Sequence, residues 1–256
     1  MRTFTRVPKI AKRRRFGFCP LSQSPYSCLE YTGRRRPIQH QGVTFMFSED
    51  EITRWKTIAP SIPTLDYHDK AVVYGQGYQL PGLFWLLKGI VKLSHITEDG
   101  VQLTIDVLGR GGVFGSTLAE YVSDHTATSL GEIHIARITD EDLNSLVVES
   151  PEFAAFLCAE LEGWQKRTER KLITLLTKRV ETRLVETLRD LAMMFGTPCP
   201  HGYALEIPLT QQDIADLVYA SRPVVTKAMN ALRRRGVLDY RRDLICVNHV
   251  ALESAA

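Results

Sequence analysis

The chain has 256 residues, of which 44% are hydrophobic and 24% are charged, a composition typical of a globular protein of one or two domains. Its longest apolar runs, such as Leu83 to Leu87, are far shorter than the roughly 20 residues of a membrane-spanning helix, which excludes a transmembrane protein. The five cysteines show neither CxxC pairs nor zinc-finger spacing, and a reducing cytoplasm is the simplest setting for them.

Charge is unevenly distributed along the chain. Residues 1–45 contain ten Lys or Arg and one acid, whereas residues 46–256 contain 22 bases and 28 acids. The first segment has arginine clusters, four prolines and no regular periodicity, so it is predicted to be a disordered basic extension. Three interpretations stay open: a basic arm that contacts nucleic acid, a transit peptide, or an upstream extension that the natural protein lacks. After Met46, Ser48 and Glu51 are spaced as a helix capping box.

Residues 71–139 contain short strand-like segments separated by glycines. Ten of the 17 glycines lie between Gly75 and Gly131, which suits repeated tight turns. Apolar and polar residues alternate from Val101 to Val107, so this strand is expected to offer one apolar face to a core. Residues 98–100 before it predict a hairpin turn. The pattern predicts an antiparallel barrel or roll.

A long helix is predicted to begin at Pro151 and to end at a break near residues 177–179. Its repeated residues are spaced by three or four positions, nearly the heptad pattern of a coiled coil: Leu157, Leu161, Trp164, Thr168, Leu172 and Leu175. Two interpretations stay open. The stripe packs on the chain's own roll, or it pairs with a second copy in a parallel coiled coil.

The most specific pattern begins at Thr210, which is spaced with Asp213 as the N-cap and capping residue of a short helix. A tight connection leads to a second helix with Ser221 as its N-cap and Pro223 in its first turn, where the missing N–H has no helical partner. The buried stripe of this second helix is formed by Val225, Ala228, Met229 and Leu232. Two short helices in this arrangement predict a helix-turn-helix.

The remaining faces of the second helix are polar and basic. Residues 220–242 contain seven bases and one acid, so they carry a charge of +6. A helix fits the DNA major groove, where Arg and Lys can donate to guanine and Asn can pair with adenine. After Gly236, residues 237–247 predict two strands of a wing whose arginines lie near the phosphate backbone. The residues predicted to contact DNA are Gln211, Ser221, Arg222, Pro223, Thr226, Lys227, Asn230, Arg233, Arg241 and Arg242.

These segments, in this order, resemble the CRP/FNR family of transcription regulators. In the roll the resemblance rests on Gly75-x-Gly77, Leu83 to Leu93, Gly100 to Leu103 and Leu108 to Gly115, and it extends to about residue 250. It implies an α+β fold: a cyclic-nucleotide-binding-like antiparallel β-roll, of the jelly-roll or double-stranded β-helix type, over residues 46–150, a dimerisation helix over residues 151–177 and a winged helix-turn-helix over residues 178–256. It also implies a homodimer on a two-fold symmetric DNA site, held by Leu157, Leu161, Trp164, Leu172 and Leu175.

The ligand positions of the family are changed in this chain. Where cAMP-binding members have a Glu for the ribose and an Arg for the cyclic phosphate, this chain has Ser116 and His125. Each lost contact to a charged group is worth roughly 1.5 to 3 kcal/mol, so cAMP is not expected as effector. Another effector, with cyclic di-GMP as one hypothesis, and an effector-independent roll both stay open. The candidate effector residues are Arg110, Gly115, Ser116, His125, Thr126, Arg137, Trp164, Thr168, Arg179 and Arg183.

Two other classes of function fit the sequence less well. The histidines show no HxH or HExxH spacing, and the chain has no GxSxG turn or Walker A loop, so neither an enzyme, a metal site nor a bound cofactor is expected. The second class is a ligand-dependent interaction protein that acts by pairing with another regulator, and the basic helix argues against it. RNA polymerase is a further partner that the resemblance suggests.

Overall fold

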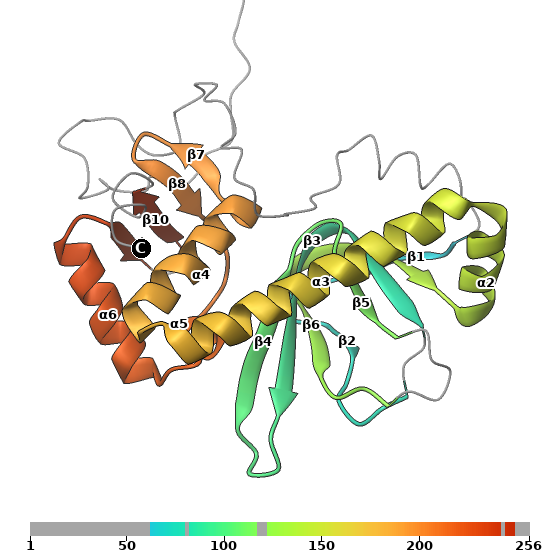
Figure 1. Ribbon diagram of the computed structural model, residues 1–256, viewed down its shortest axis with the longest axis horizontal. Coiled ribbons are helices and arrows are strands. Elements are labelled where there is room, and N and C mark those ends of the chain that lie inside the picture. The colour runs from blue at the N-terminus through green and yellow to red at the C-terminus, as the bar shows by residue number, and fades with distance from the viewer. Residues whose placement is uncertain (1–61, 80–81, 117–121, 242–243, 249–256) are drawn as a thin grey trace, which may run out of the picture.

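The computed structural model describes residues 62–79, 82–116, 122–241 and 244–248. The predicted basic extension, the capping box at Ser48 and Glu51, and Arg242 lie outside the described residues. Figure 1 shows a β domain and a C-terminal domain joined by one long helix. Among the described residues, no helix is both long and apolar enough to cross a membrane.

The N-terminal domain is the predicted antiparallel roll. Its strands are β1 (Thr64–Tyr67), β2 (Val72–Tyr74), β3 (Leu83–Ile96), β4 (Gln102–Leu108), β5 (Val113–Gly115) and β6 (Thr126–Ile138). They form one sheet in the order β1-β6-β3-β4, with β2 paired to β6 and β5 paired to β3. Ile96 pairs with Gln102, which confirms the predicted hairpin. The inner face packs around side chains that include Phe84, Leu86 and Ile135.

Strand β4 does not bury the apolar face that its alternation predicts. Leu103 is 40% exposed and Ile105 is 38% exposed, whereas the polar Thr104 is 3% exposed. The expectation that the apolar face of this strand joins the core is therefore wrong for Leu103 and Ile105. The physical reason is that the C-terminal domain docks on the polar face and hydrogen-bonds to Thr104.

Two helices follow the roll. Helix α2 (Asp140–Glu149) begins with a capping box in which Thr139 and Asp142 bond to each other's backbone N–H. Helix α3 (Pro151–Thr177) lies across the roll (Figure 1) and packs Phe153 and Phe156 against Trp85. The predicted long helix is confirmed, with Pro151 in its first turn.

The C-terminal domain is the predicted winged helix-turn-helix. It contains α4 (Val180–Phe195), β7 (Thr197–Cys199), β8 (Gly202–Leu205), α5 (Gln211–Leu217), α6 (Arg222–Arg234), β9 (Leu238–Arg241) and β10 (Leu244–Asn248). The strands form a sheet in the order β7-β8-β10-β9. The core of this domain packs Leu184 and Leu188 of α4 against Ile214 of α5 and Met229 of α6. Gly236, at a φ of 70°, ends α6 with a left-handed turn that favours glycine.

Candidate nucleic-acid interface

The start of the helix-turn-helix is fixed by a capping box. The Thr210 hydroxyl accepts a hydrogen bond from Asp213 N at 3.0 Å, and Asp213 Oδ2 accepts one from Thr210 N at 2.8 Å. This confirms the predicted cap of α5. Ser221 occupies the N-cap position of α6, but its side chain makes no capping hydrogen bond. Pro223 favours the start of this helix, because its fixed φ suits the first turn.

One face of α6 forms an open hollow at the surface of the domain, called here the α6 surface. Its lining contains three bases, two amides, a threonine and a proline but no acid: Gln211, Arg222, Pro223, Thr226, Lys227, Asn230 and Arg234. Arg222, Lys227 and Arg234 are exposed, so their charges are available to a polyanion. The opposite face of α6 buries Val225, Met229 and Leu232.

Four contacts hold α6 in place relative to its neighbours. The Thr226 hydroxyl donates to Gln211 Oε1 at 2.9 Å, which ties α6 to α5. The Tyr240 hydroxyl donates to Asn230 Oδ1 at 3.1 Å, which ties α6 to the wing. Arg233 Nε lies 2.7 Å from Asp239 Oδ1, and its guanidinium carbon lies 5.6 Å from the Tyr240 ring centroid. These contacts limit the motion of α6 before any partner binds.

Most residues predicted to contact DNA lie together. Six of the ten line the α6 surface: Gln211, Arg222, Pro223, Thr226, Lys227 and Asn230. Ser221, Arg233 and Arg241 are exposed but lie outside this lining. Arg234 lines the surface and was not predicted. Arg234 lies seven residues after Lys227 and therefore on the same side of the helix. This spacing could have predicted it.

Helix α5 contacts the roll through a partly buried ion pair. Lys92 Nζ on β3 lies 2.9 Å from Asp213 Oδ1, and the Thr104 hydroxyl donates to the same oxygen at 2.8 Å. Burial alone would raise the pKa of Asp213, but hydrogen bonds from Thr210, Lys92 and Thr104 together hold it below its usual value. Asp213 is therefore a carboxylate near neutral pH and serves both as helix cap and as ion-pair partner.

A second contact joins the two domains at the same place. Thr104 N donates to Asp216 Oδ2 at 2.9 Å, and Gln212 Nε2 donates to Asp216 Oδ1 at 2.7 Å. The roll thus covers α5, while the exposed side chains of α6 stay open. The residues that would face DNA are not covered by the roll in this conformation.

A cavity of about 220 Å³ lies where the roll, α3, α4 and the end of α5 meet, called here the hinge cavity. Its charged lining contains seven bases and four acids: Arg110, Arg167, Arg170, Lys171, Lys178, Arg183 and Arg189, with Asp106, Glu160, Glu186 and Asp190. Lys171 pairs with Asp106 at 2.7 Å, and Lys178 pairs with Glu186. The lining therefore has an excess of positive charge after these pairs are made.

Two groups in the hinge cavity lack partners among the described residues. Arg183 Nε and Glu160 Oε1 are buried and have no hydrogen-bond partner there. Burial raises the pKa of Glu160, and the nearby charge of Arg167 only partly opposes this. Buried polar atoms are normally hydrogen-bonded, so a molecule that supplied an acceptor to Arg183 would satisfy this side chain.

The ten residues predicted to bind an effector do not all line the hinge cavity. Arg110 and Arg183 line the hinge cavity. The other eight lie elsewhere: Gly115 and Ser116 at the end of β5, His125 and Thr126 at the start of β6, Arg137 near its end, Trp164 and Thr168 on α3, and Arg179 before α4. Arg167, Arg170 and Thr174 of α3 line the cavity and were not predicted, because they lie off the apolar stripe of this helix.

His125 is partly buried at the start of β6 and contacts the side chain of Tyr74. Its Nε2 shares a hydrogen bond with the Tyr74 hydroxyl at 2.8 Å, and its ring meets the Tyr74 ring edge to face. Burial lowers the pKa of His125, and the charge of Asp124 does not fully compensate. A neutral histidine at pH 7 does not supply the positive charge of a guanidinium.

Comparison with known proteins decides the family. Residues 64–150 match the cyclic nucleotide-binding domain family, and residues 156–255 match the Crp-like helix-turn-helix domain family. A global nitrogen regulator from Synechococcus elongatus is 31% identical over 175 residues, which are 66% of this chain and 79% of that relative. The chain belongs to the CRP/FNR family of transcription regulators. Its predicted fold and family are thereby confirmed.

Other CRP/FNR proteins are similar to this chain in sequence or in fold. A CRP-like cAMP-activated global transcriptional regulator from Mycobacterium tuberculosis is 28% identical over 183 residues, 70% of this chain and 81% of that relative. The c-di-GMP responsive regulator CLP from Xanthomonas campestris has the same fold, with a TM-score of 0.64 and 22% identity over 76% of this chain and 97% of CLP. The relatives are transcription regulators, and the chain is a DNA-binding regulator of this family.

Proposed function

We propose that the chain is a homodimeric transcription regulator that recognises a two-fold symmetric DNA site with α6 of each copy. The observation that carries this proposal is the α6 surface, which gathers exposed Arg222, Lys227 and Arg234 without an acid. A helix with this face fits the major groove, where bidentate donors read guanine. Arg241 on the wing strand β9 would add a contact to the phosphate backbone.

The base preference differs from that of cAMP-dependent family members. Their Arg-Glu-Arg pattern is replaced here by Arg222, Pro223 and Lys227. Guanine contacts by Arg222 and Lys227 are retained, whereas Pro223 has no carboxylate that could accept a hydrogen bond from cytosine N4. The preferred half-site therefore keeps guanines and loses the cytosine read by that carboxylate.

The outer face of α3 supports the homodimer. Leu161, Trp164 and Leu172 are 66%, 54% and 55% exposed in the single chain. They recur on one side of the helix, which suits a parallel coiled coil with a second copy. Leu157, by contrast, packs partly against its own roll, so the seam would begin at Leu161.

The hinge cavity supports a small anionic effector. Its excess of positive charge and the buried Nε atom of Arg183 suit a carboxylate or phosphate. At about 220 Å³ it is smaller than the roughly 300 to 1,000 Å³ of pockets for drug-sized ligands, which disfavours cyclic di-GMP. The neutral His125 and Ser116 argue against cAMP in the roll. An effector-independent roll and regulation by another regulator are the alternatives.

The DNA part is tested with a duplex selected from a random pool by the purified protein. Arg222→Ala combined with Lys227→Ala is expected to weaken specific binding by about 100-fold or more, because each contact is worth about 1 to 3 kcal/mol. Fluorescence anisotropy at fixed salt measures the affinity, and sedimentation gives the oligomeric state in the same buffer.

The matched control removes the same charge from the roll. Lys70 and Lys88 are both exposed there, and Lys70→Ala with Lys88→Ala should leave the specific affinity within about twofold. Unchanged binding by the α6 double variant would remove α6 as the recognition helix. A chain that stays monomeric on its selected duplex would overturn the homodimer.

Calorimetry tests the effector. We expect heat from a small dianion such as 2-oxoglutarate, none from cAMP at low micromolar concentration, and loss of the heat in Arg183→Ala. Heat from cyclic di-GMP instead would show a larger ligand, and heat from cAMP would contradict the argument from His125 and Ser116. If none of the three compounds gives heat, the proposed effector is wrong and the effector-independent roll is the remaining alternative.

A further inference from the structure

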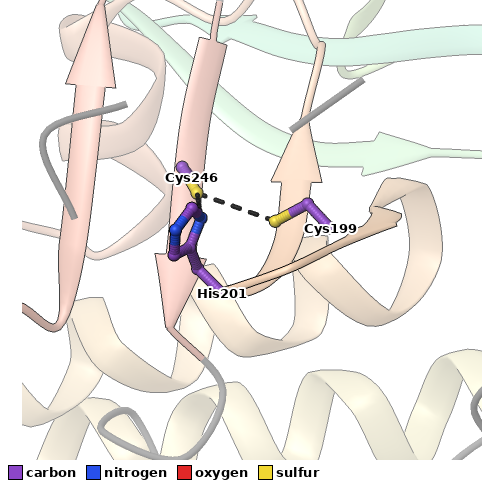
Figure 2. Close-up of side chains that lie close together, drawn as sticks. All are labelled: Cys199, His201 and Cys246. Atoms are coloured by element: carbon purple, nitrogen blue, oxygen red, sulfur yellow. Dashed lines mark hydrogen bonds between the residues drawn. The ribbon is translucent and has the colours of Figure 1, made fainter. Parts of the chain in front are cut away.

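Three metal-binding side chains meet in the sheet of the C-terminal domain. Cys199 ends β7, His201 lies in the β7–β8 turn, and Cys246 lies on β10 (Figure 2). Their ligand atoms all lie within 4.8 Å of one another, and the two cysteines are buried while His201 is partly exposed. Figure 2 shows all three side chains directed toward one another.

The distances suit tetrahedral coordination. With Zn–S bonds of about 2.3 Å, two sulfurs on a tetrahedron lie about 3.8 Å apart. The two Sγ atoms are 3.7 Å apart, and Cys246 Sγ lies 3.9 Å from His201 Nδ1. A metal ion between them would need only small side-chain rotations.

A disulfide suits this arrangement less well. Cys199 pairs with Gly202 of β8, and Cys246 pairs with Ala204 of β8, so β7 and β10 flank the same strand. Neighbouring strands are about 4.8 Å apart, which places two flanking backbones at about 9 to 10 Å. A disulfide needs Cα atoms within about 7 Å, and Cys199 and Cys246 are not joined by one. The imidazole of His201 would also have no part in it.

We propose that Cys199, His201 and Cys246 bind one Zn²⁺ ion per chain, with water at the fourth position. Two thiolates and one imidazole are ligands that zinc prefers over magnesium or calcium. Both thiols would lose their protons when the metal binds, and partly exposed His201 offers the path of entry.

The ion would stiffen the sheet that supports the recognition helix. It would join the β7–β8 hairpin, which follows α4, to β10, which pairs with the wing strand β9. Because zinc would bind the folded domain and not the separated strands, its binding would stabilise this domain. None of the three ligands lines the α6 surface, so zinc would act on DNA binding through the position of the wing.

The test uses the full chain, stripped of metal by a chelator under reducing conditions, with Co²⁺ as spectroscopic probe. We expect intense d–d absorption typical of tetrahedral Co²⁺, together with thiolate-to-metal charge transfer, saturating at one ion per chain. Added Zn²⁺ should abolish the absorption and raise the melting temperature. His201→Ala should weaken Co²⁺ binding about 10- to 100-fold or more, and Cys199→Ser should weaken binding and remove the charge transfer of one of the two thiolates.

Two control variants change the same residue types elsewhere. Cys158 is exposed on α3 and His134 lies on β6, so Cys158→Ser and His134→Ala should bind Co²⁺ as the unchanged chain does. Circular dichroism establishes that His201→Ala, which alters a partly exposed turn, is folded. The proposal is overturned if His201→Ala and Cys199→Ser are both folded and both give unchanged Co²⁺ spectra. It is also overturned if the unchanged chain shows octahedral Co²⁺ absorption.

Discussion

The α6 surface and the hinge cavity are both rich in arginine, but they are built in different ways. The α6 surface takes all but one of its lining residues from a single helix, with Gln211 of α5 as the exception. The hinge cavity combines the end of β4, three helices and the segment around Val218. A charged surface on one helix is open and suits a long polyanion, whereas a charged cavity between elements suits a small anion and can change when the elements move.

The largest change in the free energy of unfolding is expected where α5 contacts the roll, between these two regions. Asp213→Ala removes the carboxylate that accepts from Thr210 N in the capping box of α5, and it leaves the partly buried Lys92 without its ion-pair partner. Because breaking a buried pair is costly, we expect the free energy of unfolding to fall by about 3 kcal/mol at pH 7, measured by urea denaturation. The pKa of Asp213 lies below its usual value, so this contribution is present at neutral pH and is lost as pH falls below about 4.

The capping box of α2 provides the matched control. Asp142 and Thr139 make the same reciprocal bonds as Asp213 and Thr210, but the structure places no Lys beside Asp142 among the described ion pairs. Asp142→Ala should therefore cost only about 1 kcal/mol. Equal losses in the two variants would show that the contact of Lys92 with Asp213 adds nothing to the junction.

The difference between the two regions also explains what the sequence could predict. Helical spacing identifies the buried side of α6, which carries Val225, Met229 and Leu232. The opposite side is then the one predicted to face DNA. The wing and the cap at Thr210 depend on neighbouring residues only and were predicted as well. The hinge cavity depends on segments up to about a hundred residues apart, and no local pattern relates Arg110 to Arg183.

The metal-ligand cluster and strand β4 show the same limit. Cys246 follows His201 by 45 positions, so only the sheet brings them together, although the short spacing of Cys199 and His201 was visible in the sequence. In β4, alternation predicted which residues share a face but not which face is covered. The polar side of Thr104 is buried because a helix of another domain bonds to it.

A smaller effect is expected on the α6 surface itself, at Arg234. Arg234→Ala removes one exposed cation from its lining, so we expect a loss of about threefold to tenfold in DNA affinity that is similar for all sequences. The slope of log affinity against log salt should decrease in magnitude by about 1. Fluorescence anisotropy over a salt series measures both quantities.

The neighbouring arginine is the control for this prediction. Arg235 pairs with Glu181 of α4 and does not line the α6 surface, so Arg235→Ala should change the salt slope little. A loss in Arg234→Ala that is confined to one base of the selected duplex would assign it to base reading instead. That outcome would extend the recognising part of α6 by two turns from Lys227.

The smallest expected change is a gain in the free energy of unfolding, and it is expected at Glu160 in the hinge cavity. Because burial raises the pKa of this carboxyl, the folded state favours its protonated form, and stability is lost as pH rises from the ordinary carboxyl range through the raised pKa. Glu160→Gln keeps the shape without the charge and should stabilise the chain by up to about 1 kcal/mol at pH 7.5, with no gain near pH 4. Glu162→Gln, two residues along α3 at an exposed position beside Lys166, should show no such gain. A loss of stability in Glu160→Gln at pH 7.5 would mean that Glu160 is a needed anion among the arginines, and a small anionic effector would then have to compete with it.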